Sequence, residues 1–217
     1  MSLAIFDLDN TLISDDSDHL WGQFLVEKKL VDSELYDSVN TQFYHDYCQG
    51  NLDIDEYLTF ALSFLAEHPL EKLYQWREQF VNEKIRPLVL PAAQALVKKH
   101  HDRGDTLIVI TATNRFVTEP IVKLFGITNM LATEPELIDG RYTGRYVNEP
   151  CYQQGKVTRL NQWLDSNNAD LTDSTFYSDS HNDIPLLEKV SHPIAVDPDE
   201  KLKRHADENS WRIISLR

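Results

Sequence analysis

Two aspartates, Asp7 and Asp9, stand one residue apart directly after the apolar stretch "LAIF" at residues 3 to 6. Asp, Asn and Thr all favour turns, so "DLDNT" could be turn chemistry alone. Carboxylates at the end of a buried strand could instead act as nucleophile, acid or base. The polar residues elsewhere in the chain decide between these interpretations.

Further polar side chains follow other predicted strands. Thr111 ends the β-branched run at residues 106 to 111, and Asp179 and Asp183 lie in "SDSHND" after another strand. Lys156 lies at the start of the helix predicted between those two strands. The carboxyl ends of the strands of a doubly wound sheet face one crevice. We therefore expect four carboxylates, a hydroxyl and an ammonium group to meet there.

The four carboxylates, the hydroxyl and the ammonium group together suit metal-assisted chemistry on a phosphate. Several carboxylates cannot all stay ionised side by side without a cation, which predicts a hard divalent metal. Mg²⁺ takes a few oxygen ligands, keeps waters and suits phosphate substrates. Lys156 and Thr111 would donate to a phosphoryl group, and a carboxylate could then attack phosphorus.

The elements that must position these residues divide the chain in two. Residues 18 to 86 show apolar residues at helical spacing with no strand signal, and Asp53 with Glu56 forms a capping-box pattern. From Pro87 onward strands alternate with helices, and Asp139-Gly140 marks a hairpin turn. The predicted fold is α/β, a doubly wound, Rossmann-like parallel sheet, with an inserted all-helical cap. The core would comprise residues 1–13 and 89–217, and the cap residues 14–88.

The composition of the chain indicates which classes of partner and which cellular compartment to expect. The 217 residues include 35 Asp and Glu against 21 Lys and Arg, a net charge of −14, so nucleic acid is not an expected partner. No apolar run approaches the roughly 18 residues of a membrane span, and the N-terminus has no signal-peptide pattern. The two cysteines, Cys48 and Cys151, form no CxxC motif, which argues against a disulfide framework or zinc. We expect a cytoplasmic protein.

Four stretches in this order resemble the motifs of the haloacid dehalogenase-like phosphohydrolases: "DLDNT", "VITATN", Lys156 and "YSDSHNDIPLL". The chain is similar to the phosphoserine-phosphatase-like branch, which carries a helical cap between its first two motifs. The stretches "DSDHLW" and "EPCYQQGK" resemble a bacterial subgroup that includes histidinol-phosphate phosphatases. The resemblance covers nearly the whole chain.

The resemblance implies a role for each carboxylate. Asp7 would be the nucleophile and a Mg²⁺ ligand, and an aspartyl-phosphate would form on it. Asp9 would be the general acid and base, with its backbone carbonyl on the metal. Asp179 would bind Mg²⁺ directly, and Asp183 would bind the metal or its waters. A plain helix N-cap is the structural alternative for Asp183.

The resemblance also implies a phosphate-binding set. Thr111 and Lys156 would hold the phosphoryl oxygens, and Asn182 would help to hold Lys156 or the phosphate. Taken alone, Thr111 could be an ordinary strand end and Lys156 a solvated surface residue. His181, where the branch usually has glycine, could touch the leaving group or only fill its loop. Cys151 is interpreted as a small packed residue.

The cap should choose the substrate. Phosphoserine phosphatases hold the substrate carboxylate with a cap arginine, and this chain has no arginine before Arg77. The loop after the first motif instead carries acidic residues and a histidine, expected at the mouth of the crevice: Asp15, Asp16, Asp18 and His19. A solvated helix face with an N-cap at Ser17 or Asp18 explains part of this acidity. The remainder favours a cationic substrate.

The predicted function is therefore Mg²⁺-dependent hydrolysis of a small cationic phosphomonoester, with histidinol phosphate the first choice. Phosphoserine or another small phosphorylated metabolite is the alternative substrate. A phospho-acceptor or binding module of the same fold that does not hydrolyse phosphate is the alternative from another class. The helical cap and Asp9 argue against that module.

Overall fold

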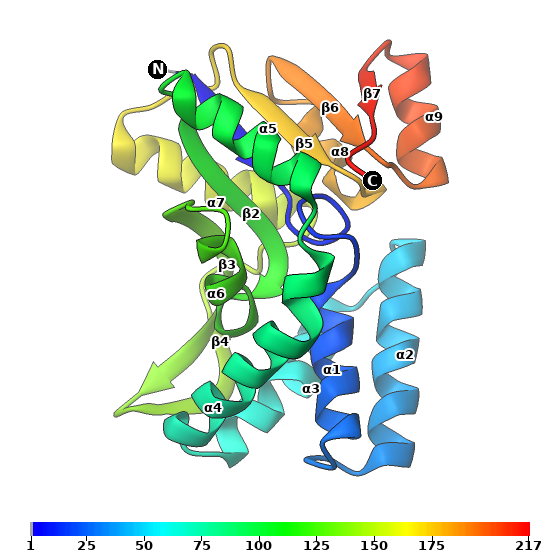
Figure 1. Ribbon diagram of the computed structural model, residues 1–217, viewed down its shortest axis with the longest axis vertical. Helices are drawn as coiled ribbons and strands as arrows, with labels where there is room; N and C mark the ends of the chain where they lie inside the picture. Colours follow the sequence, from blue (N-terminus) through cyan, green and yellow to red (C-terminus); the bar gives the residue numbers. More distant parts are fainter. Residues whose placement is uncertain (1) are drawn as a thin grey trace.

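The computed structural model describes residues 2–217, and within them seven strands form a single sheet (Figure 1). The strand order is β4-β3-β2-β1-β5-β6-β7, and the pairs are parallel except for the antiparallel β3–β4 hairpin. The strands are β1 (Leu3–Phe6), β2 (Thr106–Asn114), β3 (Asn129–Ile138), β4 (Arg141–Val147), β5 (Thr175–Ser178), β6 (His192–Val196) and β7 (Arg212–Ile214). The predicted doubly wound sheet is confirmed.

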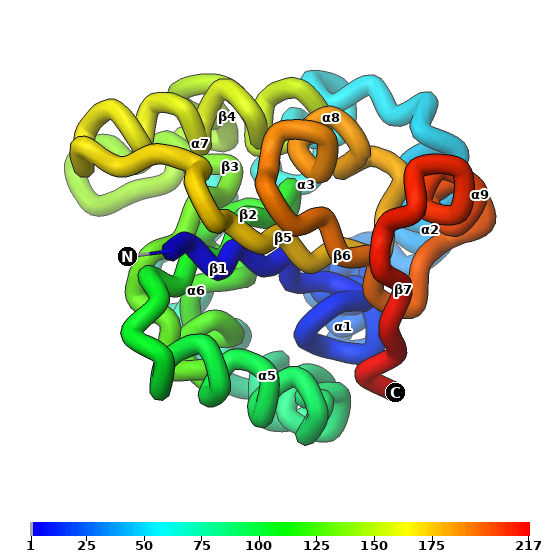
Figure 2. The backbone as a smooth tube through the Cα atoms, turned by 90° about the horizontal axis from the view of Figure 1, so that it is seen from above, coloured from blue at the N-terminus to red at the C-terminus, as the bar shows by residue number. Residues whose placement is uncertain are grey.

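Helices cover both faces of the sheet, as the view from above shows (Figure 2). On one face lie α5 (Pro91–Asp102) and α6 (Arg115–Lys123), and on the other α7 (Gln154–Asn167), α8 (Ile184–Leu187) and α9 (Glu200–Glu208). Alternate side chains of β1 enter the two cores: Phe6 packs in the α5–α6 layer and Ile5 in the α7–α9 layer. The central strand is thus buried on both sides, as its uninterrupted apolar sequence requires.

A helical insertion follows β1. It contains α1 (Ser17–Glu27), α2 (Ser33–Gln49), α3 (Ile54–Glu67), α4 (Leu70–Phe80), a π-helical turn (Val81–Ile85) and a 3₁₀ turn (Arg86–Leu88). It lies in the lower half of the molecule in Figure 1, beneath the carboxyl end of β1 and beside the β3–β4 hairpin. An antiparallel bridge joins Ile13 to Val89, where the chain enters and leaves this cap. The bridge supports the proposed division at residues 14 and 88.

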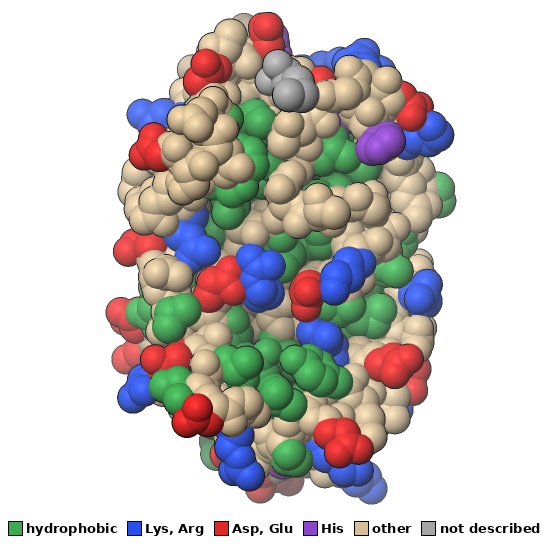
Figure 3. Space-filling model, turned by 90° about the vertical axis from the view of Figure 1, so that its left-hand side faces the viewer, with side chains coloured by type: hydrophobic (Ala, Val, Ile, Leu, Met, Phe, Trp, Pro, Cys, Tyr) green, Lys and Arg blue, Asp and Glu red, His purple; other side chains and the backbone are tan. Residues whose placement is uncertain are grey.

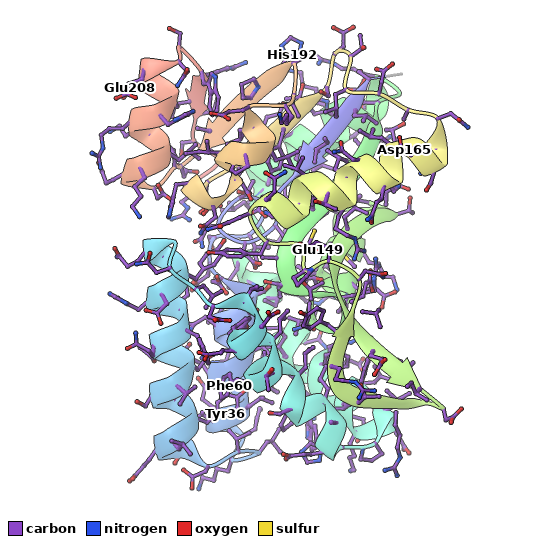
Figure 4. All side chains as sticks on the ribbon, turned by 180° about the vertical axis from the view of Figure 1, so that it is seen from behind. Tyr36, Phe60, Glu149, Asp165, His192 and Glu208 are labelled. Carbon is purple, nitrogen blue, oxygen red and sulfur yellow. The ribbon has the colours of Figure 1, made fainter. Side chains whose placement is uncertain are left out.

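Aromatic side chains hold the cap together and onto the sheet. Trp21 and Phe24 of α1 contact Phe80 of α4 with ring centroids 5.2 and 5.6 Å apart, and Trp21 also contacts Phe116 of α6 at 5.8 Å. Between α2 and α3 the rings of Tyr36 and Phe60 lie side by side, 4.5 Å apart (Figure 4). One hydrophobic core therefore continues from the cap into the α5–α6 layer.

Local signals of the sequence agree with the structure at two places and fail at a third. Asp53 caps α3 by accepting from the backbone N–H groups of Asp55 and Glu56, as predicted. Asp139 and Gly140 both have positive φ, 49° and 75°, which the predicted two-residue hairpin turn requires. The N-cap expected at Ser17 or Asp18 is wrong.

The residue that caps α1 is Asp16, whose side chain accepts from the N–H groups of Asp18 and His19 at 2.9 and 2.8 Å. Several acceptors in "SDDSD" suit a cap, and the helix begins after the one whose backbone is extended. Asp16 is therefore buried near Asp9 instead of lying in solvent.

Two other elements differ from expectation. The strand expected to end at Thr111 continues to Asn114, so Thr111 lies inside β2. Helix α9 was not predicted, because only Leu202 and Ala206 of its nine residues are buried in a run of charges. Across residues 2–217 no helix is long and apolar enough to cross a membrane. Figure 3 shows acidic and basic side chains interspersed over one broad face.

Candidate active site

The turn after β1 places the first two candidate residues. Parallel pairing continues one step past the strand, because the N–H of Asp7 donates to the carbonyl of Tyr177 at 2.9 Å. Asn10 then adopts φ of 56°, and the N–H of Leu12 donates to the carbonyl of Leu8 at 2.8 Å. This tight turn keeps Asp7 and Asp9 at the carboxyl end of the sheet, and both are buried.

Lys156 joins two of the carboxylates. From the first turn of α7 its Nζ donates to Oδ1 of Asp7 at 2.7 Å and to Oδ2 of Asp183 at 2.8 Å. Asp183 also accepts from the Ser178 hydroxyl at 2.7 Å. Lys156 is 2% exposed, so it is not the solvated surface residue of the structural alternative. Three strand and helix ends thus meet at one ammonium group.

The electrostatics follow from this burial. Burial raises the pKa of Asp7 to about 7, against the pull of Lys156. Burial by itself would lower the pKa of Lys156, but the carboxylates of Asp183 and Asp7 raise it above its usual value. The lysine therefore carries its charge throughout the physiological range and offers it to any anion beside Asp7.

Asp9 has different partners. Its Oδ1 accepts from the backbone N–H of Ser17 at 2.7 Å, and its Oδ2 accepts from the Thr113 hydroxyl at 2.9 Å. The Thr111 hydroxyl is 3.5 Å from the same oxygen and accepts from the N–H of Thr113. Burial, followed by the negative charge of Asp16, raises the pKa of Asp9 to about 7. A carboxyl group so placed can hold and release a proton near neutral pH.

Asp179 completes the acidic floor. The Thr11 hydroxyl donates to its Oδ1 at 3.1 Å. Burial and then the negative charges of Asp7 and Asp183 raise the pKa of Asp179 well above its usual value. The floor holds Asp7, Asp179 and Asp183 against a single ammonium group, an excess of negative charge that a divalent cation would neutralise.

The donor set therefore fits a hard cation, although in the described part of the chain no group of three or more His, Cys, Asp or Glu side chains is arranged to hold one. In the set implied by the resemblance, the carboxylates of Asp7 and Asp179 and the backbone carbonyl of Asp9 bind the metal, and Asp183 binds the metal or its waters. In the structure, Asp183 accepts hydrogen bonds from Lys156 and Ser178. Oxygen donors of this mixed kind are those that Mg²⁺ takes.

Asn182 and His181 lie on the outer side of the same loop. The Asn182 amide donates to the backbone carbonyl of Tyr47 in the cap at 3.1 Å, and its oxygen accepts from Gln153 at 3.0 Å, so the structure does not place it on Lys156. The His181 ring lies 2.7 Å from Asp199. The sulfhydryl of Cys151 is fully buried, and burial raises its pKa to about 12, as expected of a packed residue.

Above the floor the cap covers a cavity that is continuous with Asp7, Asp9, Thr111 and Thr113. Asp16, Asp18 and His19 all line it, whereas Asp15 does not. The other cap residues that line it are Asn40, Phe43, Tyr44, Tyr47, Leu52, Ile54 and Tyr57. Among the residues described, neither Lys nor Arg faces this cavity.

The acidic side chains of the cavity lack a counter-charge. Burial raises the pKa of Asp16 to about 7, with the charge of Asp18 as the next cause, and burial likewise raises that of Asp18 to about 7. The Tyr57 hydroxyl donates to Asp18. Burial lowers the pKa of His19, whose ring stacks on Tyr44 at 4.5 Å. A cation entering the cavity would hold both carboxyl groups in their ionised form.

Several residues of the site escaped the sequence reasoning. Thr113 binds Asp9 more closely than Thr111 does, and a period of two along the strand puts both on one face, so the signal was present in "TATN". Thr11 comes two residues after Asp9, but its hydrogen bond to Asp179 was not predicted. Asn40 and Tyr57 come from separate cap helices and carried no signal, because only tertiary packing brings them to the cavity.

The comparisons with known proteins agree with this geometry. Residues 4–188 match the model of the haloacid dehalogenase-like hydrolase family. A histidinol-phosphatase of Neisseria meningitidis serogroup C (strain 8013) is 46% identical over 220 residues, covering 100% of this chain and 99% of the relative.

Two solved structures extend the likeness. A crystal structure of a protein of unknown function from Bordetella pertussis Tohama I has a TM-score of 0.93 at 41% identity, covering 100% of this chain and 99% of the other. A substrate-bound phosphoserine phosphatase shares the fold, with a TM-score of 0.73 at 20% identity over 98% of this chain and 92% of the other. With four motifs at the strand ends, a helical cap and a family match over most of its length, the chain belongs to the haloacid dehalogenase-like hydrolase family.

Proposed function

We propose that the protein is a phosphatase that cleaves a small phosphomonoester through an aspartyl-phosphate on Asp7. The observation that carries the proposal is the buried contact of 2.7 Å between Asp7 and Lys156, directly below the cap cavity. A carboxylate is a weak nucleophile toward a dianionic phosphate unless the phosphate charge is neutralised. Lys156 stands where it can supply that charge, and Thr111 adds a hydroxyl.

Asp9 is the proposed proton carrier. Oδ of Asp7 attacks phosphorus while protonated Asp9 gives its proton to the departing alcohol oxygen. Asp9, now ionised, takes a proton from the water that attacks the aspartyl-phosphate, which releases inorganic phosphate and restores both residues. The hydrogen bonds from Ser17 and Thr113 orient the carboxyl group for both transfers.

We further propose that Mg²⁺ is the cofactor. Asp7 and Asp179, with the Asp9 backbone carbonyl, would hold it, and Asp183 would stay beside it on Lys156. The ion supplies charge neutralisation for the phosphoryl group when bound. The surplus of acidic groups on the floor supports this assignment, because the single charge of Lys156 compensates only one of the floor's three carboxylates, Asp7, Asp179 and Asp183.

The proposed substrate is cationic, and histidinol phosphate fits best. It carries an ammonium and an imidazole and no carboxylate. The cavity offers Asp16 and Asp18 without a counter-charge, together with the aromatic rings of Phe43 and Tyr44. Phosphoserine would bring its carboxylate into a cavity with no Lys or Arg among its described lining residues, which costs binding energy. The name of the relative from Neisseria meningitidis supports the same choice.

A comparison of histidinol phosphate and phosphoserine as substrates, each with and without Mg²⁺, tests the proposal. We expect a kcat/KM at least about 100-fold higher for histidinol phosphate, since a buried unpaired charge is strongly unfavourable. We expect EDTA to abolish phosphate release and Mg²⁺ to restore it. A preference for phosphoserine would overturn the substrate assignment, whereas turnover that is unaffected by EDTA would overturn only the metal.

A further inference from the structure

The C-terminal end of the cap helix α2 meets the core at two segments, the loop with His181 and Asn182 and the helix α9. Figure 1 shows α2 and α9 end to end, and the first turn of α9 faces the last turn of α2. The match ends at residue 188, so α9 and its side chains lie beyond it. The contact joins parts of the chain about 150 residues apart.

Lys201, in the first turn of α9, makes the link. Its Nζ donates to the backbone carbonyl of Gln49, the last residue of α2, at 2.7 Å, and lies 3.4 Å from Nε2 of His181. The carbonyl groups at the end of a helix lack helical partners and carry partial negative charge, so an ammonium there is favourable. The carbonyl of Tyr47, two residues earlier, accepts from Asn182 at 3.1 Å.

Gly50 allows the two surfaces to approach this closely. It ends α2 with φ of 76°, and a methyl group on it would lie 2.7 Å from Nε2 of His181. His181 cannot easily turn away, because its backbone N–H and its ring Nδ1 both lie within 2.8 Å of Asp199. A side chain at position 50 would push the end of α2 away from the core.

The same turn of α2 carries a wall of the cavity. Tyr47 lines it, and the Tyr47 ring packs 6.0 Å from that of Tyr152, next to Gln153 and the helix that bears Lys156. A shift of this turn therefore opens the cavity on the side nearest Lys156 and Asp183. Contacts that hold the turn in place keep the cavity enclosed.

We propose that Lys201 is a positioning residue that clasps the end of α2 to the core and so holds the cap closed over the bound phosphoester. The clasp consists of Lys201 on the Gln49 carbonyl, Asn182 on the Tyr47 carbonyl and the close approach of Gly50 to His181. Loss of the clasp lowers the fraction of enzyme in the closed form. The apparent affinity for substrate falls by the same fraction, while chemistry within the closed form is unchanged.

Two pairs of variants test the clasp. Lys201→Met removes the ammonium, and Lys203→Met is its control, because Lys203 is an exposed lysine of the same helix. Gly50→Ala adds the methyl group, and Gly104→Ala is its control. Gly104 has φ of 78°, so the backbone strain is matched, but a methyl group there would meet nothing within 4 Å.

Two readouts are measured on the full chain. Amide hydrogen exchange over residues 46–52 needs no substrate, and we expect it to be faster in Lys201→Met and Gly50→Ala than in their controls. With p-nitrophenyl phosphate we expect KM to rise about threefold in Lys201→Met and more in Gly50→Ala, with kcat not reduced.

The clasp is overturned if exchange over residues 46–52 matches the controls, or if kcat falls while KM stays at the control value. The kinetic readout rests on the proposed phosphatase function, whereas the exchange readout does not. A wild-type enzyme inert toward every phosphomonoester would therefore refute the function and still leave exchange to decide the clasp.

Discussion

The floor and the roof of the cavity are both acidic, but only the floor has a cation. On the floor, Asp7 and Asp183 lie 2.7 and 2.8 Å from the buried ammonium of Lys156. The roof is the part of the cavity lining that the cap provides, and there Asp16 and Asp18 have hydrogen-bond donors but no Lys or Arg among the described lining residues. The carboxylates of the floor therefore have a counter-charge in the protein itself, whereas those of the roof would obtain one only from a cationic ligand.

This difference separates chemistry from recognition. In the proposed mechanism, the preformed Asp7–Lys156 pair at the sheet edge would neutralise and align a phosphoryl group whatever alcohol it carries. Buried carboxyl groups without a charged partner strengthen the binding of a cationic ligand and weaken the binding of an anionic one. Changes on the floor should therefore affect all substrates equally, and changes in the roof should affect cationic substrates selectively.

The largest effect is expected from Asp7→Asn. We expect kcat to fall by about 10³-fold or more for every phosphomonoester, because an amide oxygen does not form the acyl-phosphate bond. Phosphate release from histidinol phosphate and from p-nitrophenyl phosphate measures it. The variant should unfold within a few degrees of wild type, because Asn still accepts from Lys156. Retention of wild-type turnover would remove Asp7 as nucleophile.

Lys156→Met tests the charge balance of the floor. It leaves Asp7 and Asp183 buried without their counter-charge, and we expect a loss of about 3 to 5 kcal/mol in the free energy of unfolding without Mg²⁺. Chemical denaturation measures this loss, with Lys189→Met as the exposed control. Mg²⁺ should restore more stability to the variant than it adds to wild type. An unchanged midpoint would show that the pair is not what compensates the floor.

Asp18→Asn tests selectivity in the roof. We expect kcat/KM for histidinol phosphate to fall about 30-fold, since the ammonium loses its ionised partner, and that for p-nitrophenyl phosphate to change less than about twofold. Steady-state kinetics with both substrates measure the ratio. Asp37→Asn, which removes an exposed acid from the same cap, is the control. An equal loss on both substrates would erase the distinction between roof and floor.

The smallest effect is a pH dependence of stability. Burial raises the pKa of Asp16 from its usual 3.8 to about 7. The contribution of the protonated carboxyl group to the free energy of unfolding is therefore complete below pH 4 and is lost as the pH rises through 7. Asp16→Asn cannot ionise and keeps the cap of α1. The Tm of this variant relative to wild type should therefore be higher at pH 8 than at pH 5. Parallel differences at both pH values would contradict the raised pKa.

The sequence predicted the residues of the floor better than those of the roof. Asp7, Asp9, Asp179 and Asp183 could be located because each follows or flanks a recognisable strand, and parallel strands bring such ends together. The roof depended on where helices pack. Asp16 was expected at the mouth of the crevice and lines the cavity, but its role as the N-cap of α1 was not predicted. The cavity positions of Asn40, Tyr44 and Tyr57 were not predicted either.

Sequence patterns predicted a structural feature correctly where that feature depends only on neighbouring residues. The turn at Asp139-Gly140 and the cap at Asp53 were predicted because neighbouring residues determine both. Helix α9 was missed, because its nine residues are held by two buried side chains and by contacts with distant segments. Asn182 was expected to help to hold Lys156 or the phosphate, and the structure adds a contact that was not expected, from its amide to the cap backbone 135 residues away in the sequence.

The sequence by itself thus determined the order of the motifs, the alternation of strands and helices, and the residues at the strand ends, since these are local properties of composition and period. Only the tertiary structure decided which hydroxyl binds Asp9, that Lys156 bridges Asp7 and Asp183, and that the roof has acids without a counter-charge. The reason is physical: hydrogen bonds and pKa values depend on distance and burial, and both arise from contacts between residues far apart in the chain.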